Sequence, residues 1–90
     1  GSVEAIFNAI DKFFNQTVRL DTFNIDAVTE GIDAQAAVNV TVENVDTDTI
    51  FNATGSDFDV LKSAAIAYIN ANIMVQKENE GQLARLSEKD

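Results

Sequence analysis

The sequence contains neither cysteine nor histidine. Without cysteine the chain has no disulfide framework, and without both residue types it lacks the usual nitrogen and sulfur ligands of a zinc site. Histidine-based acid/base catalysis and nucleophilic triads are excluded for the same reason. We therefore expect no catalytic residue in this chain.

Basic residues and long apolar runs are also scarce. Six Lys and Arg against 15 Asp and Glu give a formal net charge of −9. Such a chain repels phosphate backbones and anionic membrane surfaces over roughly 8 Å at physiological salt. No run approaches the ~18 apolar residues of a membrane span, and no basic start followed by an apolar core marks a signal peptide. We expect a soluble, cytoplasmic protein that contacts neither nucleic acid nor membrane.

The beginning of the chain shows the apolar spacing of a helix. Apolar side chains recur at steps of three and four over residues 3–14, so they share one stripe of a helix. The stripe consists of Val3, Ile6, Phe7, Ile10, Phe13 and Phe14. Ser2 is placed to cap this helix, and Glu4 lies near the positive end of its dipole.

The next segment alternates between apolar and polar residues, which is typical of a strand. Residues 23–27 follow this alternation, whereas Val18 and Leu20 have the opposite phase. A bulge near Asp21 reconciles the two phases.

The middle of the chain contains two further strands joined by turns. In residues 36–43, one set of positions (Ala36, Val38, Val40, Val42) alternates with another (Ala37, Asn39, Thr41, Glu43), and residues 49–54 form a shorter run. Turn-forming residues precede each run, at 29–33 around a glycine and at 44–47. The pattern predicts an antiparallel sheet of three strands.

The last predicted helix, residues 60–73, is apolar almost all the way round. Its only polar residues are Lys62, Ser63, Asn70 and Asn72. So wide an apolar surface should be covered on more than one side. Gly55 is predicted to lie in a turn before the helix, and Ser56 or Asp57 to cap it.

Together these elements predict an α+β fold, a two-layer or three-layer sandwich in the order helix, strand, strand, strand, helix. Residues 1–74 make up this domain, and residues 75–90 are expected to form a flexible polar tail. Because one three-stranded sheet covers a single side of the last helix, we expect a second copy to cover the other side in a symmetric homodimer.

Three segments carry a resemblance to a known family. They are residues 1–11, which begin Gly-Ser-Val-Glu-Ala, residues 27–36 and residues 55–72. In this order they resemble the Gly-Pro-Val-Asp-Ala start of the first helix, the strand-turn-strand segment and the last helix of the C-terminal regulatory domain of the 2-isopropylmalate synthase and citramalate synthase family. The chain departs from that family in two ways. It has only the first unit's helix before a whole second unit of three strands and a helix, and Ala53-Thr54-Gly55 replaces a Gly-x-Gly turn.

The resemblance implies a non-catalytic, allosteric module. In that family acetyl-CoA condenses with a 2-oxo acid in a separate barrel, which holds the divalent metal, and the regulatory domain binds the feedback inhibitor. The implied partners are that catalytic barrel and a second copy of the domain. The implied effector is leucine in 2-isopropylmalate synthase and isoleucine in citramalate synthase, and the placement of one methyl group is worth only about 1–3 kcal/mol in a pocket. A dimerisation module without a ligand is the further alternative.

The resemblance also implies where the effector binds. The family's pocket lies between the strand-turn segment and the start of the first helix, which corresponds to Val3, Glu4, Ala34 and Ala36. The small residues of segment 33–36 leave room for a ligand near the backbone, and close packing of the strand on a helix is the alternative explanation.

Side chains of the last helix are expected to complete this slot. Leu61, Ala65 and Tyr68 are the apolar candidates. Tyr68 also fits a core aromatic residue whose hydroxyl reaches the rim.

Aspartates near the last helix are candidates for a cation site. Asp57 and Asp59, together with Asp33, provide carboxylates. Capping and the helix dipole explain two aspartates at a helix start better, at about 0.3–1 kcal/mol each, and the spacing of a calcium loop is absent. We therefore expect no metal site.

Overall fold

The computed structural model describes residues 2–28 and 34–88. The elements are α1 (Val3–Phe14), β1 (Val18–Val28), β2 (Ala36–Asn44), β3 (Thr49–Asp57) and α2 (Val60–Glu88). The three strands form one antiparallel sheet in the order β1-β2-β3. The predicted α+β fold and its element order are confirmed.

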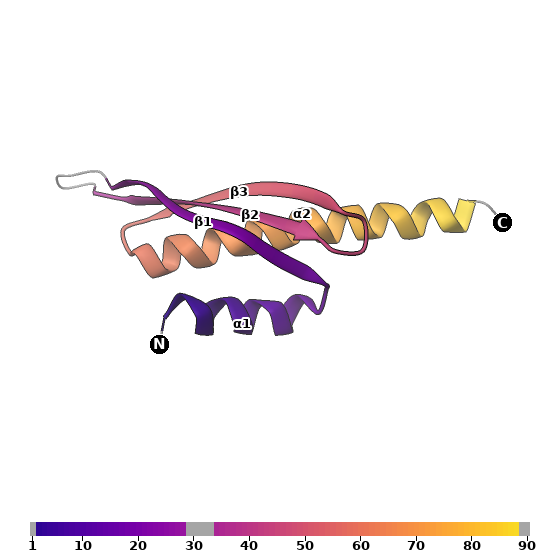
Figure 1. Cartoon of the computed structure of the whole chain (residues 1–90), viewed down its shortest axis with the longest axis horizontal. Coiled ribbons are helices and arrows are strands. Elements are labelled where there is room, and N and C mark those ends of the chain that lie inside the picture. Colours follow the sequence, from indigo (N-terminus) through magenta and orange to yellow (C-terminus); the bar gives the residue numbers. More distant parts are fainter. Residues whose placement is uncertain (1, 29–33, 89–90) are drawn as a thin grey trace.

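The elements are stacked as a sheet, a long helix and a short helix. Helix α2 runs along β2 and β3, and α1 lies beside α2 on the side away from the sheet (Figure 1). The C-terminal part of α2 projects beyond the end of the sheet (Figure 1). The side of α2 opposite the sheet is therefore covered only in part, by α1.

The pairing of β1 with β2 is interrupted twice. The first register shift lies between Leu20 and Thr22, which confirms the bulge predicted near Asp21. The second lies between Ile25 and Ala27, within the segment that was predicted to alternate without a break. A bulge adds a residue to one strand and reverses its phase, so Ala27 pairs with Ala37 and the predicted alternation ends after Ile25.

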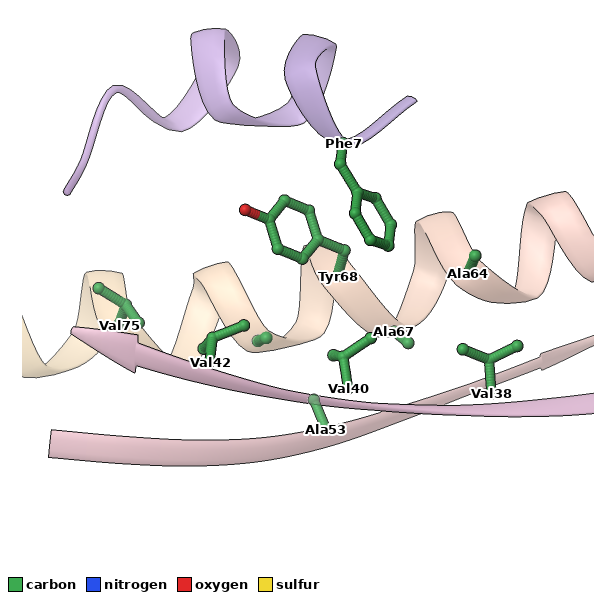
Figure 2. Packing of buried hydrophobic residues seen from close by; sticks show 10 residues of the cluster. Phe7, Val38, Val40, Val42, Ala53, Ala64, Ala67, Tyr68 and Val75 are labelled. Carbon is green, nitrogen blue, oxygen red and sulfur yellow. The ribbon is translucent and has the colours of Figure 1, made fainter. Parts of the chain in front are cut away.

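The core lies between β2 and α2. Alternate side chains of β2 are buried, as predicted: Ala36, Val38, Val40 and Val42. They meet the small residues Ala64, Ala67 and Ala71 of α2, with Val75 extending the contact (Figure 2). Because these alanines have short side chains, the helix axis lies close to the sheet.

Gly55 marks the closest approach of α2 to β3. The sequence pattern predicted a turn here, but β3 continues through Gly55 to Asp57, and Gly55 is buried. A Cβ atom at Gly55 would lie 2.5 Å from the backbone nitrogen of Ala67 and closer still to the carbonyl oxygen of Ser63. The glycine is therefore required by helix-to-strand packing and not by a turn.

The helix caps differ from the prediction. Ser2 occupies the position before α1 with a positive φ of 133° and makes no side-chain cap bond. At the start of α2, the capping residue is Asp59, whose Oδ1 accepts the N–H of Leu61 at 2.8 Å. Asp57 supports this cap by accepting the N–H of Asp59 at 2.9 Å. The two carboxylates are thus engaged with the backbone.

Helix α2 continues far beyond Ile73, the predicted end of the helix, and ends at Glu88. Val75 is fully buried. Glu78 then accepts hydrogen bonds from the hydroxyls of Thr49 and Thr47, both at 2.7 Å, and from the amide of Asn44 at 2.8 Å. We call this group the Glu78 clamp. The hydrogen bonds from Thr49 and Thr47 hold the pKa of Glu78 below its usual value.

Candidate functional site

An apolar groove lies between the two helices. It has a volume of about 330 Å³, and its lining side chains are Ala9, Ile10, Phe13, Phe14 and Ile69. Phe13 is 82% exposed and packs edge-on against Phe14, with ring centroids 5.2 Å apart. A phenylalanine so exposed beside an apolar groove is typical of an interaction surface.

The groove continues along α2 as a strip of isoleucines. Ile66, Ile69 and Ile73 follow at steps of three and four, so they share one side of the helix. Ile69 is two residues, about half a turn, from both Ala67 and Ala71, so it points away from the sheet that buries those alanines. Ile66 and Ile69 are each 37% exposed.

We name this surface the helix face and define it as Ala9, Ile10, Phe13, Ile66, Ile69 and Ile73. It bears on the prediction that one sheet cannot cover the whole last helix. Ala67 and Ala71 are fully buried by the chain itself, whereas Ile66 and Ile69 remain exposed. The apolar surface that needs a cover is therefore the isoleucine strip together with the end of α1.

A polar and aromatic network joins α1 to α2 beside this face. The ring of Phe7 stacks on that of Tyr68 at 4.2 Å (Figure 2), and the Tyr68 hydroxyl donates to Asp11 Oδ1 at 2.5 Å. Farther along, Gln16 Nε2 donates to the carbonyl of Asn72 at 2.8 Å. Burial, and next the hydrogen bond to Asp11, raise the pKa of Tyr68. Tyr68 is thus a neutral, buried donor that ties the two helices together.

The residues predicted to bind an effector fall into three settings. Ala36 and Tyr68 are each 2% exposed, and the Ala36 carbonyl accepts the Ser63 hydroxyl at 2.8 Å. Val3, Ala34 and Ala65 are half-buried, and Glu4 and Leu61 are exposed. Val3 packs against the core from α1. None of these residues lines the groove between the helices.

The structure adds residues that sequence reasoning did not single out. Asp11, Gln16 and Asn72 form the polar contacts between the helices, and Glu78 holds the turn between β2 and β3. A polar residue on an otherwise apolar helix is the only sequence signal for Asn72. The contacts of Glu78 depend on α2 continuing past Ile73, and the polar composition of residues 75–90 did not predict that continuation.

The acidic residues form no metal centre in the described part of the chain. Within residues 2–28 and 34–88, no group of three or more acidic side chains is placed to hold a metal ion. Asp33 of the suggested cation site lies outside the described residues. Over the same described ranges, no helix has both the length and the apolar character required to cross a bilayer.

Comparison with known proteins gives a consistent set of relatives. The chain is 69% identical over 85 residues to 2-isopropylmalate synthase of Streptococcus gallolyticus, which covers 94% of this chain and 16% of that protein. It is 59% identical over 91 residues to 2-isopropylmalate synthase of Lactococcus lactis subsp. lactis, covering 100% of this chain and 18% of the relative. The 2-isopropylmalate synthase of Listeria monocytogenes is 44% identical over 72 residues, which cover 80% of this chain and 14% of that protein.

The chain therefore spans less than a fifth of the length of these curated relatives. No solved structure matches it. The family model described as the LeuA allosteric (dimerisation) domain matches residues 1–75, which include all of α1, the sheet and the buried part of α2. The chain belongs to the LeuA allosteric (dimerisation) domain family.

Proposed function

We propose that this chain is the regulatory and dimerising module of a 2-isopropylmalate synthase, and that it binds leucine at an interface of the domain. The names of the relatives and of the matching family support the first part. The module itself is non-catalytic, since the chain has no histidine or cysteine. Condensation of acetyl-CoA would belong to another part of the parent enzyme.

The observation that carries the dimerisation is the exposed helix face. A second copy related by a two-fold axis would place its own helix face against this one, so that both pairs of helices lie between two sheets. Burying apolar area stabilises by roughly 25 cal/mol per Å². The repulsion between two chains of charge −9 is screened beyond roughly 8 Å at physiological salt.

Substitution of Ile69 tests this arrangement. Ile69→Asn should make the chain sediment as a single copy at micromolar concentration, where the unchanged chain sediments as a dimer. Val45→Asn is the matched control, because Val45 is similarly exposed, at 42%, but lies in the turn between β2 and β3. An unchanged chain that is monomeric at this concentration, or equal masses for the two variants, would contradict the proposed face.

The effector is proposed to bind where the dimer brings α1 and the strand-turn segment together. The contacting residues are Val3, Glu4, Ala34, Ala36, Leu61, Ala65 and Tyr68. Two of them are buried in a single copy, Ala36 and Tyr68. They would support the pocket from behind, while the half-buried and exposed residues contact the ligand.

Calorimetric titration separates the possible effectors. Leucine should release the most heat and bind most tightly of leucine, isoleucine and valine. Tighter binding of isoleucine would instead indicate a citramalate synthase module. A dimer that gives no heat with any of the three would be a dimerisation module without a ligand.

A further inference from the structure

The two edges of the sheet differ in their suitability for pairing. Strand β1 is interrupted at two places and carries charges at Arg19, Asp21 and Asp26. Bulges and charges are the features that keep an edge strand from pairing with another chain. Strand β3 has neither feature over most of its length, because its register with β2 is continuous and residues 49–56 include no charged residue.

A groove runs beside this unprotected edge. Its volume is about 480 Å³, and it is lined by Asn52, Ala53, Thr54, Asn70, Ile73, Met74 and Lys77. Asn70 Nδ2 donates to the carbonyl of Thr54 at 2.9 Å. This β3 carbonyl is thus accessible to a donor from outside the sheet, and the N–H of an added strand can replace the side-chain amide.

We propose that the free edge of β3 pairs with β3 of a second copy of this chain, which joins two three-stranded sheets into one of six strands. This contact borders the helix face, with which its groove shares Ile73, and uses the main-chain groups that an edge strand leaves unpaired. An antiparallel pair about a two-fold axis uses the same residues on both copies.

Charge complementarity selects a second copy as the occupant. Lys77 lines the groove together with Asn52, and the next residue, Glu78, binds Thr49, so Lys77 lies beside the first half of β3. In an antiparallel pair, the start of one β3 lies next to the end of the other, where Asp57 is located. The pairing therefore brings Lys77 of each copy near the partner's Asp57, and the symmetry forms this ion pair twice.

Charge reversal tests the pairing in a background that lacks the helix contact. In the Ile69→Asn variant, edge pairing should produce a dimer at submillimolar concentration. Adding Lys77→Glu alone or Asp57→Lys alone should weaken this association about tenfold or more, because each change brings like charges together at both ends of the pair. Lys12→Glu, an exposed lysine on α1, is the matched control and should have no effect.

Mixing the two charge variants distinguishes pairing from misfolding. An equimolar mixture of the Lys77→Glu and Asp57→Lys chains should associate as a mixed dimer, because both of its contacts are then attractive. Amide exchange in β3 should be slower in the mixed dimer, at high concentration, than in either chain alone. An Ile69→Asn chain that stays monomeric at submillimolar concentration would overturn edge pairing without contradicting the helix-face dimer. A folded mixture that fails to associate would also overturn edge pairing.

Discussion

Tyr68 donates a hydrogen bond to Asp11 across the boundary between α2 and α1, at 2.5 Å. The donor is almost completely buried, at 2% exposure, and its ring stacks on Phe7. A buried hydroxyl bonded to a carboxylate holds α1 at a defined rotation on α2.

Removing the hydroxyl should loosen α1. Tyr68→Phe keeps the ring stacking but loses the hydrogen bond, and a hydrogen bond to a charged group contributes about 1.5–3 kcal/mol. We expect a loss of this size in the free energy of unfolding, measured in urea. Asp11→Asn is the control, because it retains an acceptor and should cost less. Equal stability of Tyr68→Phe and the unchanged chain would show that the contact contributes nothing.

The same contact should make stability depend on alkaline pH. Burial and Asp11 raise the pKa of folded Tyr68, whereas an unfolded tyrosine titrates near 10. The stabilisation is therefore complete below about pH 10 and is lost as the pH rises above that value. Urea unfolding at a series of alkaline pH values should show this decline in the unchanged chain and a smaller one in Tyr68→Phe.

The two glycines described in the structure should respond oppositely to alanine. Gly55→Ala places a Cβ against the backbone of α2, and overpacking of this kind costs about 1–3 kcal/mol. Gly81→Ala has no heavy atom within 4 Å of the added Cβ and lies within α2, where the change should stabilise by about 0.5–1 kcal/mol. Thermal unfolding of both variants checks the contrast, and a neutral Gly55→Ala would contradict the close approach of helix and strand.

The Glu78 clamp should control the order of the end of α2. Glu78→Gln weakens three hydrogen bonds, so amide exchange should accelerate from Asn79 onward while residues 60–73 keep their protection. Because the pKa of folded Glu78 is lowered, the clamp is fully formed above the unfolded value near 4.3 and is lost as the pH falls below it. Glu80→Gln, at an exposed neighbouring position, is the control. Identical exchange in the two variants would exclude this role.

The proposed effector slot is best probed at Ala34. Ala34 is half-buried, whereas Ala36 lies in the core beneath Ser63, so a larger residue at Ala36 would disturb packing as well as binding. Ala34→Leu should abolish the rise in melting temperature caused by leucine and leave the unliganded melting temperature nearly unchanged. A folded Ala34→Leu chain with a full response to leucine would place the effector elsewhere.

Local periodicity accounts for what the sequence predicted correctly. The stripe of α1, the alternation of β2 and the phase change at Asp21 each depend on near neighbours, and each is found in the structure. The contacts that were not predicted join distant residues. Gly55 is small because Ser63 and Ala67 pack on it, and α2 extends beyond Ile73 because Val75 is buried and Glu78 binds the turn.

The candidate site was predictable only in outline. The excess of apolar residues on the last helix indicated an interface, since hydrophobicity is a property of each residue. The division of that helix between its own sheet and the exposed isoleucine strip required the fold. The polar links through Asp11, Gln16 and Asn72 pair residues more than fifty positions apart, which no local pattern encodes.

The contact at Gly55 also limits how this domain can move. The backbone of Ser63 and Ala67 and the Cβ of Ile66 lie directly against Gly55, so α2 cannot move closer to β3 without a steric clash. The sheet and α2 should therefore shift as one rigid body. Helix α1 is attached to α2 through side chains, so a change in its angle requires only that these side-chain contacts break, and it is the internal motion we expect. A signal carried by the domain would then be a change in the angle of α1 and not a bending of the sheet.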